Sequence, residues 1–276
     1  MIADVSASPY TTYHFEHSAD RAAMLEMRAM IALQPPVDFG PLGGGAILYL
    51  HGGAYVVGSA QAYRHFAGQI AARAKAPAFV TDYRLAPERP FPAAVEDADA
   101  AYRGLSVGGF HHIAVAGDSA GGGLALITTR KMAQAARDRG TPAPVAACVM
   151  SPWTDLALTG GSIAARAKHD PLLTRDALEH AQHLYLGQAD ASDPCASPLY
   201  GNFTGLPPIL LHVGEDEILL DDTRRYADLV AKSGSSTELH VWQGMVHVFP
   251  SNLALLQAAR EALDITGEFL RCNLGR

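Results

Sequence analysis

The sequence predicts an α/β protein with a mainly parallel central sheet of about six strands and helices on both faces. Apolar runs bounded by turn residues alternate with segments of helical periodicity along most of the 276 residues, and this alternation is typical of a parallel sheet covered by helices. Most of these runs are continuously apolar, as expected of strands that are buried on both faces.

The order of these segments gives the expected elements. Strands are expected at AILYL (46–50), PAFVTDY (77–83), HIAVA (112–116), PVAACVM (144–150), PILLHV (208–213) and TELHVW (237–242). Helices are expected near 61–75, 93–105, 120–137, 221–233 and 252–271. In the second helix, Pro92 suits the first turn because its φ is fixed near the helical value, and apolar residues recur at helical spacing.

The segment from Trp153 to Pro207 interrupts this alternation. It contains one clear helical pattern, at 174–187, between flanks that are rich in turn residues. A long insertion between two strands of such a sheet usually lies over the carboxyl edge, where ligands bind. We therefore expect a single domain over residues 1–276, with a lid formed by about residues 1–40 and by an insertion at about 154–206.

Composition and charge exclude several classes of protein. The formal charge is −7 and Lys and Arg form no cluster, which disfavours a nucleic-acid partner because nucleic acids are bound by basic surfaces. No apolar run reaches the ~18 residues that span a bilayer, so no membrane partner is expected. Residues 1–15 have neither a basic start nor an apolar signal core, which predicts a cytoplasmic location. The three cysteines are far apart and lack zinc-site spacing, so reduced thiols are expected.

The segment AVAGDSAGGG (114–123) is the first candidate for chemistry. A dinucleotide-binding loop fails on spacing, because Leu126 stands where the third glycine is needed. A phosphate-binding loop fails because no lysine follows the glycines. Residues Gly117 to Gly121 fit GxSxG, in which a sharp strand-to-helix turn presents a serine, here Ser119, as a nucleophile. An ordinary tight turn at the start of a helix is the alternative interpretation.

A second candidate is LYLHGGAYVVGS (48–59), which follows a predicted strand. When a carbonyl carbon is attacked, negative charge grows on its oxygen, and fixed backbone N–H groups stabilise that charge. Glycines allow the chain to approach closely, so Gly52 and Gly53 are expected to supply two such donors and Ala120 the third. An ordinary strand-to-loop turn is the alternative here.

A base and an orienting acid are expected after later strands, because α/β-hydrolases place these groups in the chain order serine, acid, histidine. Asp216 follows the strand at 208–213, and His247 follows the strand at 237–242. The position of Asp216 alone does not exclude its neighbours as the acid. These rivals are Glu215, Glu217, Asp221 and Asp222.

Together these motifs resemble the hormone-sensitive-lipase-like branch of the α/β-hydrolases, which are mostly bacterial carboxylesterases. The resemblance covers about residues 46–250 and rests on HGGAYVVGS, DYRLAPERPFPAAVEDA, GDSAGGGLAL, SPWTDL, GLPPILLHVGEDEILLDD and GMVHVF. It implies the α/β-hydrolase fold with a helical lid, and a catalytic triad of Ser119, Asp216 and His247. It also implies Asp216 as the acid among its rivals.

The resemblance further implies Gly52, Gly53 and Ala120 as the oxyanion hole. The third glycine of the family's HGGG motif is Ala54 in this chain, a frequent variant that leaves both donating glycines in place. The resemblance implies that His51 supports the oxyanion loop through its side chain, as its counterpart in the family does, so we do not expect it to act as a base.

One departure from the family concerns the sheet. Family members usually carry two antiparallel strands before the HGG strand, but only a short segment separates Ala32 from Ala46. Without those strands the strand at 77–83 becomes an apolar edge that needs cover. We expect six main parallel strands, with the N-terminal segment or a second subunit covering this edge.

The function expected is a serine carboxylesterase that hydrolyses short-to-medium acyl esters through an acyl-enzyme intermediate, without a cofactor or metal. The alternatives are a lactone hydrolase, a deacetylase, and a non-catalytic hydrolase fold that binds a small ligand. The expected partner is a small-molecule ester or lactone, and family analogy suggests a homodimer. The pairs His111/His112 and His180/His183 lack an accompanying carboxylate or cysteine cluster, so they are not expected to bind a metal.

Overall fold

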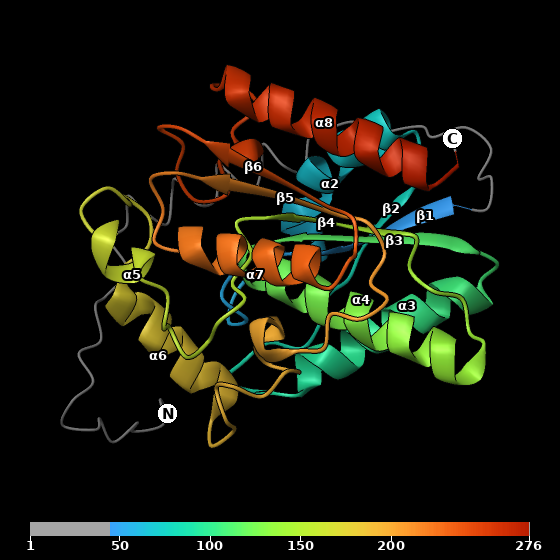
Figure 1. The fold of residues 1–276 in the computed structure, drawn as a ribbon, viewed down its shortest axis with the longest axis horizontal. Helices are drawn as coiled ribbons and strands as arrows, with labels where there is room; N and C mark the ends of the chain where they lie inside the picture. Colours follow the sequence, from blue (N-terminus) through green and yellow to red (C-terminus); the bar gives the residue numbers. More distant parts are fainter. Residues whose placement is uncertain (1–44, 276) are drawn as a thin grey trace, which may run out of the picture. The chain divides into compact units, whose positions relative to one another are not determined.

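The computed structural model describes residues 45–275. Its centre is a six-stranded sheet, all parallel, in the order β2-β1-β3-β4-β5-β6 (Figure 1). The strands are β1 (Gly45–Leu50), β2 (Ala78–Val80), β3 (His112–Asp118), β4 (Ala146–Met150), β5 (Ile209–Gly214) and β6 (Thr237–Trp242). The predicted α/β class and the six parallel strands are confirmed.

Helices cover both faces of this sheet. Figure 1 shows α2 (Ala60–Ala74) and α8 (Gln257–Asn273) on one face, and α3 (Ala93–Val107), α4 (Ser119–Arg139) and α7 (Leu220–Lys232) on the other. The C-terminal helix begins later than the predicted residue 252, because Phe249–Ser251 forms a short 3-10 helix and the chain turns before Gln257. None of the helices within residues 45–275 combines the length and the apolar character that a membrane span requires.

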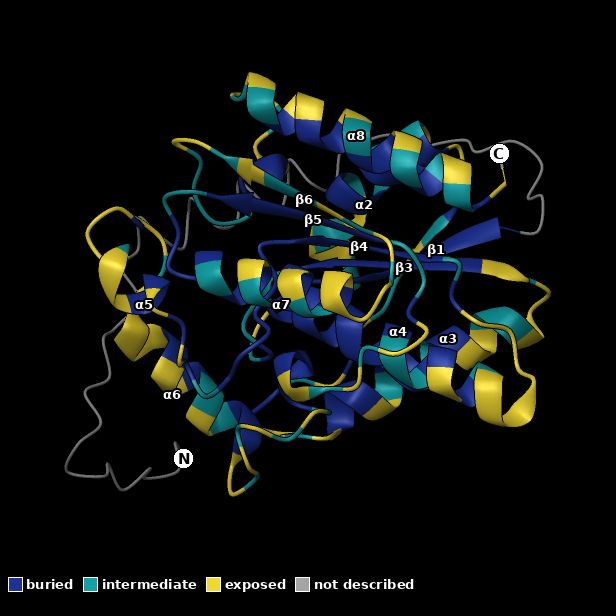
Figure 2. Ribbon diagram, viewed as in Figure 1, coloured by how far each residue is buried: buried dark blue, intermediate teal, exposed yellow. Residues whose placement is uncertain are grey.

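The sheet separates the two largest apolar clusters of the described residues. Side chains of α3, α4 and α7 pack on one face in a cluster that includes Val115, Leu124 and Tyr226. Side chains of α2 and α8 pack on the other face in a cluster that includes Ile70 and Leu263. Strands β1, β4 and β5 are buried along their whole length, which explains why their sequences are continuously apolar (Figure 2).

The two edge strands differ from the central ones. Strand β2 has only three residues, and Phe79 is 38% exposed. Strand β6, at the opposite edge, contains only half-buried and exposed residues. Strand β2 is therefore the edge strand that the sequence predicts, but it is shorter than the predicted range of 77–83. The N-terminal segment expected to cover it lies outside the described residues.

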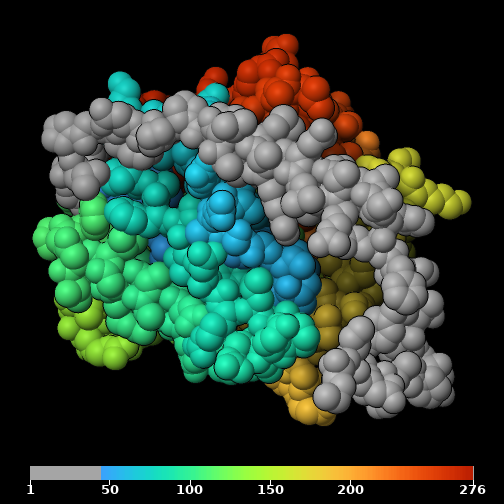
Figure 3. All heavy atoms as spheres, turned by 180° about the vertical axis from the view of Figure 1, so that it is seen from behind, coloured from blue at the N-terminus to red at the C-terminus, as the bar shows by residue number. Residues whose placement is uncertain are grey.

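Seen from behind, the chain between about residues 50 and 100 occupies the centre of the surface, with α8 above it (Figure 3).

The segment between β4 and β5 is the predicted insertion. It contains α5 (Ser162–Ala165), α6 (Arg175–Leu186) and the 3-10 helix η1 (Pro198–Tyr200). Figure 1 shows α5 and α6 beyond the carboxyl ends of the strands. Helix α6 was predicted at 174–187 and begins where the Thr174 side chain accepts a hydrogen bond from the Ala177 N–H. The lid assigned to about residues 1–40 lies outside the described residues.

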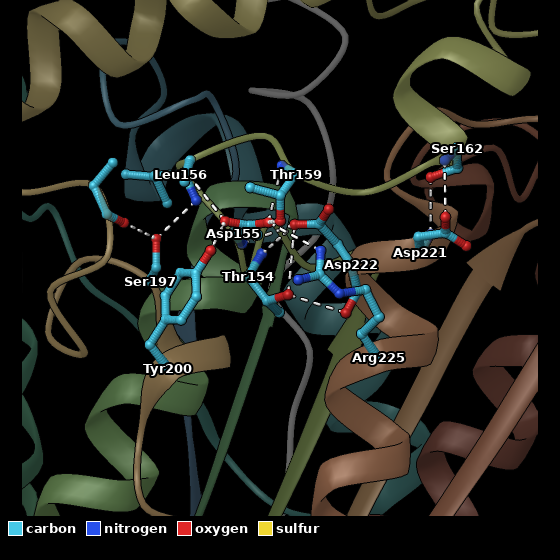
Figure 4. Close-up of polar contacts among 12 residues, drawn as sticks. Thr154, Asp155, Leu156, Thr159, Ser162, Ser197, Tyr200, Asp221, Asp222 and Arg225 are labelled. Carbon is cyan, nitrogen blue, oxygen red and sulfur yellow. Dashed lines mark hydrogen bonds and ion pairs between the residues drawn. The ribbon is translucent and has the colours of Figure 1, made fainter.

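Polar contacts fasten this insertion to α7, as Figure 4 shows. Side-chain oxygen Oδ2 of Asp222, on α7, accepts the N–H groups of Thr154 and Asp155, both at 2.8 Å. Asp155 in turn accepts the Tyr200 hydroxyl at 2.8 Å and pairs with Arg225 at 3.0 Å. The first residues of the insertion, the 3-10 helix η1 and α7 therefore share one hydrogen-bonded cluster.

Candidate active site

Ser119 lies at the junction of β3 and α4, where the strand reverses directly into the helix. Its φ is +53°, a left-handed conformation that is strained for a serine. A Cβ atom on Gly117 would lie 2.4 Å from the Gly121 carbonyl oxygen, and one on Gly121 would lie 2.1 Å from the Leu50 carbonyl oxygen. Both glycines of the GxSxG motif are thus required sterically, and the structure places Ser119 on the strand-to-helix elbow that the sequence predicts.

His247 lies in the loop after β6 and reaches this serine. Its Nε2 is 2.9 Å from Ser119 Oγ. The loop is held by Val248, whose N–H donates to Ser151 Oγ at 3.0 Å. Val248 itself has a φ of +49°, so a tight backbone turn follows the histidine. The structure therefore brings together the predicted nucleophile and the predicted base, which lie 128 residues apart in the chain.

The acid beside His247 is Glu217, and the prediction of Asp216 is wrong on this point. Glu217 Oε1 lies 3.3 Å from His247 Nδ1, and the Glu217 side chain is fully buried. Its other oxygen accepts the Ser151 hydroxyl at 2.7 Å and the Gly214 N–H at 3.0 Å. Three polar contacts therefore fix this carboxylate against the imidazole.

Asp216 points elsewhere because successive residues of the turn after β5 face different directions. Its N–H donates to the Met245 carbonyl at 3.0 Å, and its carboxylate lies 3.8 Å from the Arg166 guanidinium. Glu215 faces the same guanidinium at 3.4 Å. These two acids pair with the insertion. The rival Glu217 was identified in the sequence, but position after a strand could not distinguish it from a neighbour one residue away.

The oxyanion loop lies directly beside the first turn of α4. A Cβ on Gly121 would lie 2.2 Å from the His51 carbonyl oxygen, so the two backbones are in contact. Gly53 has a φ of +119°, which only glycine adopts easily. Among residues 45–275, no acceptor engages the Gly53 N–H, and the Ala120 N–H belongs to the first helical turn, where no intrahelical acceptor exists.

Gly52 departs from its predicted role. Its N–H donates to Asp118 Oδ1 at 3.0 Å, so this donor is already engaged within the protein. The reason is the buried carboxylate of Asp118, which the sequence analysis did not assign to any role. Of the three predicted oxyanion donors, Gly53 and Ala120 therefore retain a free N–H in the described part of the chain.

His51 supports the loop, as expected. It is buried, its Nδ1 lies 2.8 Å from the Gly52 carbonyl oxygen, and its ring stacks on Tyr83 with centroids 4.3 Å apart. The Tyr83 hydroxyl donates to the His51 carbonyl at 2.6 Å. Burial lowers the pKa of His51, which favours a neutral ring that packs rather than a charged one.

Within residues 45–275, no group of three His, Cys, Asp or Glu side chains is arranged to hold a metal ion. The pair His180 and His183 lies on the exposed part of α6. The arrangement of Ser119, His247, Glu217 and backbone donors is suited to acyl transfer, in which a serine attacks a carbonyl and an imidazole carries the proton.

A family model and several known relatives match most of this chain. A family model described as the alpha/beta hydrolase fold matches residues 47–251. An acetyl-hydrolase of Streptomyces hygroscopicus is 43% identical, in an alignment that covers 84% of this chain and 77% of the relative. An esterase of Acinetobacter venetianus is 34% identical over 81% of this chain and 73% of its own.

Solved structures that are similar to this chain are also esterases. The esterase EstE5, in a crystal soaked with ethyl alcohol, is 38% identical with a TM-score of 0.83, and the match covers 98% of this chain and 95% of that one. An esterase from the bacterial hormone-sensitive lipase family is 35% identical with a TM-score of 0.79, over 95% of this chain and 100% of that one. The chain thus belongs to the α/β-hydrolase fold family, in the group of the bacterial hormone-sensitive lipase esterases.

Proposed function

We propose that this protein is a serine carboxylesterase in which Ser119, His247 and Glu217 form the catalytic triad. The observation that carries the proposal is the continuous contact from Ser119 Oγ to His247 Nε2 at 2.9 Å and from His247 Nδ1 to Glu217 at 3.3 Å. This chain of groups lies beside the N–H groups of Gly53 and Ala120, which are proposed as the oxyanion hole.

The reaction follows from these contacts. Ser119 Oγ attacks the ester carbonyl while neutral His247 takes the hydroxyl proton, and the carbonyl oxygen becomes an oxyanion near the Gly53 and Ala120 N–H groups. Glu217 holds the imidazole tautomer and stabilises the imidazolium. The imidazolium then donates its proton to the leaving alcohol, and an acyl-enzyme ester forms on Ser119. Water activated by His247 releases the acid and restores the serine.

The proposed substrates are esters with short to medium acyl chains. Relatives named acetyl-hydrolase and ethyl acetate hydrolase, 43% and 34% identical to this chain, support the short end of this range. A lactone hydrolase or a deacetylase would use the same groups. A purely ligand-binding role is disfavoured because the base lies within hydrogen-bond distance of the nucleophile. The cytoplasmic location and the homodimer stay predictions from the sequence.

A substrate panel tests the proposal. p-Nitrophenyl esters from acetate to dodecanoate, measured beside simple lactones and acetylated amines, should give the highest kcat/KM for short acyl esters. Ser119→Ala should lower kcat by about 10⁴-fold or more, as the loss of a nucleophile does in other serine hydrolases. Ser106→Ala, on α3, is the matched control and should retain full activity. Full hydrolysis by Ser119→Ala would exclude the proposed mechanism.

A further inference from the structure

Asp118 is a buried carboxylate next to the nucleophile that the mechanism above does not use. It is the last residue of β3 and is 1% exposed. Although it occupies the N-cap position of α4, its side chain makes no capping hydrogen bond to that helix. Burying a carboxylate costs free energy unless hydrogen bonds compensate, so its partners indicate its role.

These partners come from the oxyanion side of the site. Asp118 Oδ1 accepts the Tyr49 hydroxyl at 2.7 Å and the Gly52 N–H at 3.0 Å, and Oδ2 accepts the Tyr63 hydroxyl at 3.2 Å. Burial raises the pKa of Asp118 to about 6, so at neutral pH the carboxylate is ionised and acts only as an acceptor. Two phenols fix the carboxylate, and the carboxylate fixes one backbone N–H.

That N–H belongs to the residue before the proposed oxyanion donor. A Cβ on Gly52 would lie 2.2 Å from Asp118 Oδ2, so the loop backbone touches the carboxylate directly. The Gly52 carbonyl lies 2.8 Å from His51 Nδ1, and the Gly53 carbonyl accepts the Val57 N–H at 3.0 Å. The peptide that carries the Gly53 N–H is therefore held on both sides by hydrogen bonds.

We propose that Asp118 is a positioning residue: through the Gly52 N–H it fixes the Gly52–Gly53 peptide so that the Gly53 N–H donates to the oxyanion formed on attack by Ser119. This inference rests on the proposed esterase function. A backbone donor stabilises an oxyanion only when it is held at the right place, and small displacements of catalytic groups lower rates strongly. Asp118, which directly precedes the nucleophile in the chain, supplies this restraint.

The test removes the acceptor and then restores it. Asp118→Ala should lower kcat for p-nitrophenyl acetate by about 100-fold and change KM less than about threefold, because the restraint acts on the transition state. Rates are counted per serine that reacts with a fluorophosphonate, so that unfolded protein does not contribute. Asp118→Asn retains an acceptor for the Gly52 N–H and should recover the rate to within about fivefold of the natural protein.

Inhibition by phenylboronic acid gives a second readout, because its tetrahedral adduct on the serine places an oxygen in the oxyanion hole. In Asp118→Ala its Ki should rise by a factor similar to the fall in kcat, as expected of a transition-state analogue. If Asp118→Ala does not fold, Asp118→Leu serves, since leucine has a similar shape and cannot accept a hydrogen bond. Asp99→Ala is the matched control, because Asp99 is a buried aspartate of α3 that pairs with Lys131 of α4 and contacts none of the proposed catalytic groups.

The outcomes separate the two hypotheses. A natural kcat per reactive serine in Asp118→Ala, or an unchanged Ki, would overturn the positioning role and leave the esterase function intact. A fall in the number of reactive serines alone would show that Asp118 serves only stability, which also overturns the proposal. Activity in Ser119→Ala would instead overturn the esterase mechanism itself.

Discussion

At the scale of single residues, the site depends on which of two adjacent carboxylates faces the imidazole. Glu217 is buried and contacts His247, Ser151 and the Gly214 N–H. Asp216 is about a third exposed and contacts Arg166. A buried, hydrogen-bonded carboxylate can hold a histidine tautomer, whereas an exposed pair with an arginine contributes little.

The matched pair Glu217→Gln and Asp216→Asn tests this assignment. Glu217→Gln should lower kcat by about 10²- to 10⁴-fold, because a neutral amide neither fixes the tautomer nor stabilises the imidazolium. Asp216→Asn should change kcat less than about threefold, since it weakens only a partly exposed ion pair. Steady-state kinetics on p-nitrophenyl acetate measure both. The reverse ranking would return the acid to Asp216.

Single residues also show where sequence reasoning succeeded and failed. Ser119 could be predicted because its flanking glycines are required by contacts below 2.5 Å, a constraint visible in the motif. The acid could not, because the choice between residues 216 and 217 depends on side-chain direction in a turn. Gly52 could not either, because the sequence does not reveal that Asp118 engages its N–H.

At the scale of elements, α7 is the support on which the insertion rests. Asp222 Oδ2 accepts two N–H groups from the start of the insertion, while no partner in the described residues engages its buried Oδ1. Burial raises the pKa of Asp222 to about 8. Helix α7 therefore carries a carboxyl group that is protonated at neutral pH when the protein is folded.

This shift predicts how stability depends on pH. The folded state binds the Asp222 proton more tightly than the unfolded chain does, so the free energy of unfolding falls as pH rises from about 4 to about 8 and is then level. Asp222→Asn lacks this proton. The natural protein should therefore exceed the variant in Tm by more at pH 6 than at pH 9, in thermal melts followed by circular dichroism. An equal gap at both pH values would contradict the shift.

At the scale of the whole molecule, the sheet places every proposed catalytic group at one edge. The loop after β1 carries the proposed oxyanion donor Gly53, β3 leads into Ser119, and the turns after β5 and β6 carry the proposed acid and base. Register explains the convergence: Leu50 pairs with Gly117, and Asp118 pairs with Met150. The convergence of these groups could be predicted from the alternation of strands and helices in the sequence, because parallel strands end at a common edge.

The same sheet predicts a gradient of local stability. Strand β3 is buried between β1 and β4, whereas β2 is a three-residue edge with an exposed phenylalanine. Native-state hydrogen exchange of β3 amides should be slower than that of β2 amides by about 100-fold or more, because edge strands open locally. Mass spectrometry of peptic fragments measures this ratio. Comparable protection in β2 would indicate that another segment or subunit covers the edge, as the sequence suggests.

The approximate positions of the main helices and of the six strands were predictable because they depend on the periodicity of apolar residues, which the local sequence records. The short helix α5 was not predicted, since four residues give too little pattern. Its place depends on long-range contacts: the Ser162 hydroxyl donates to the Ile218 carbonyl at 2.6 Å, and the Ser162 N–H donates to Asp221 at 2.8 Å. Such contacts join residues more than fifty positions apart.

Helix α8 packs on the face opposite α3, α4 and α7, and supplies none of the groups proposed for the reaction. Its apolar stripe, which includes Leu263 and Leu270, packs against the sheet. Evolutionary drift or laboratory engineering can therefore rework this layer for heat tolerance while the esterolytic machinery on the far side keeps its geometry.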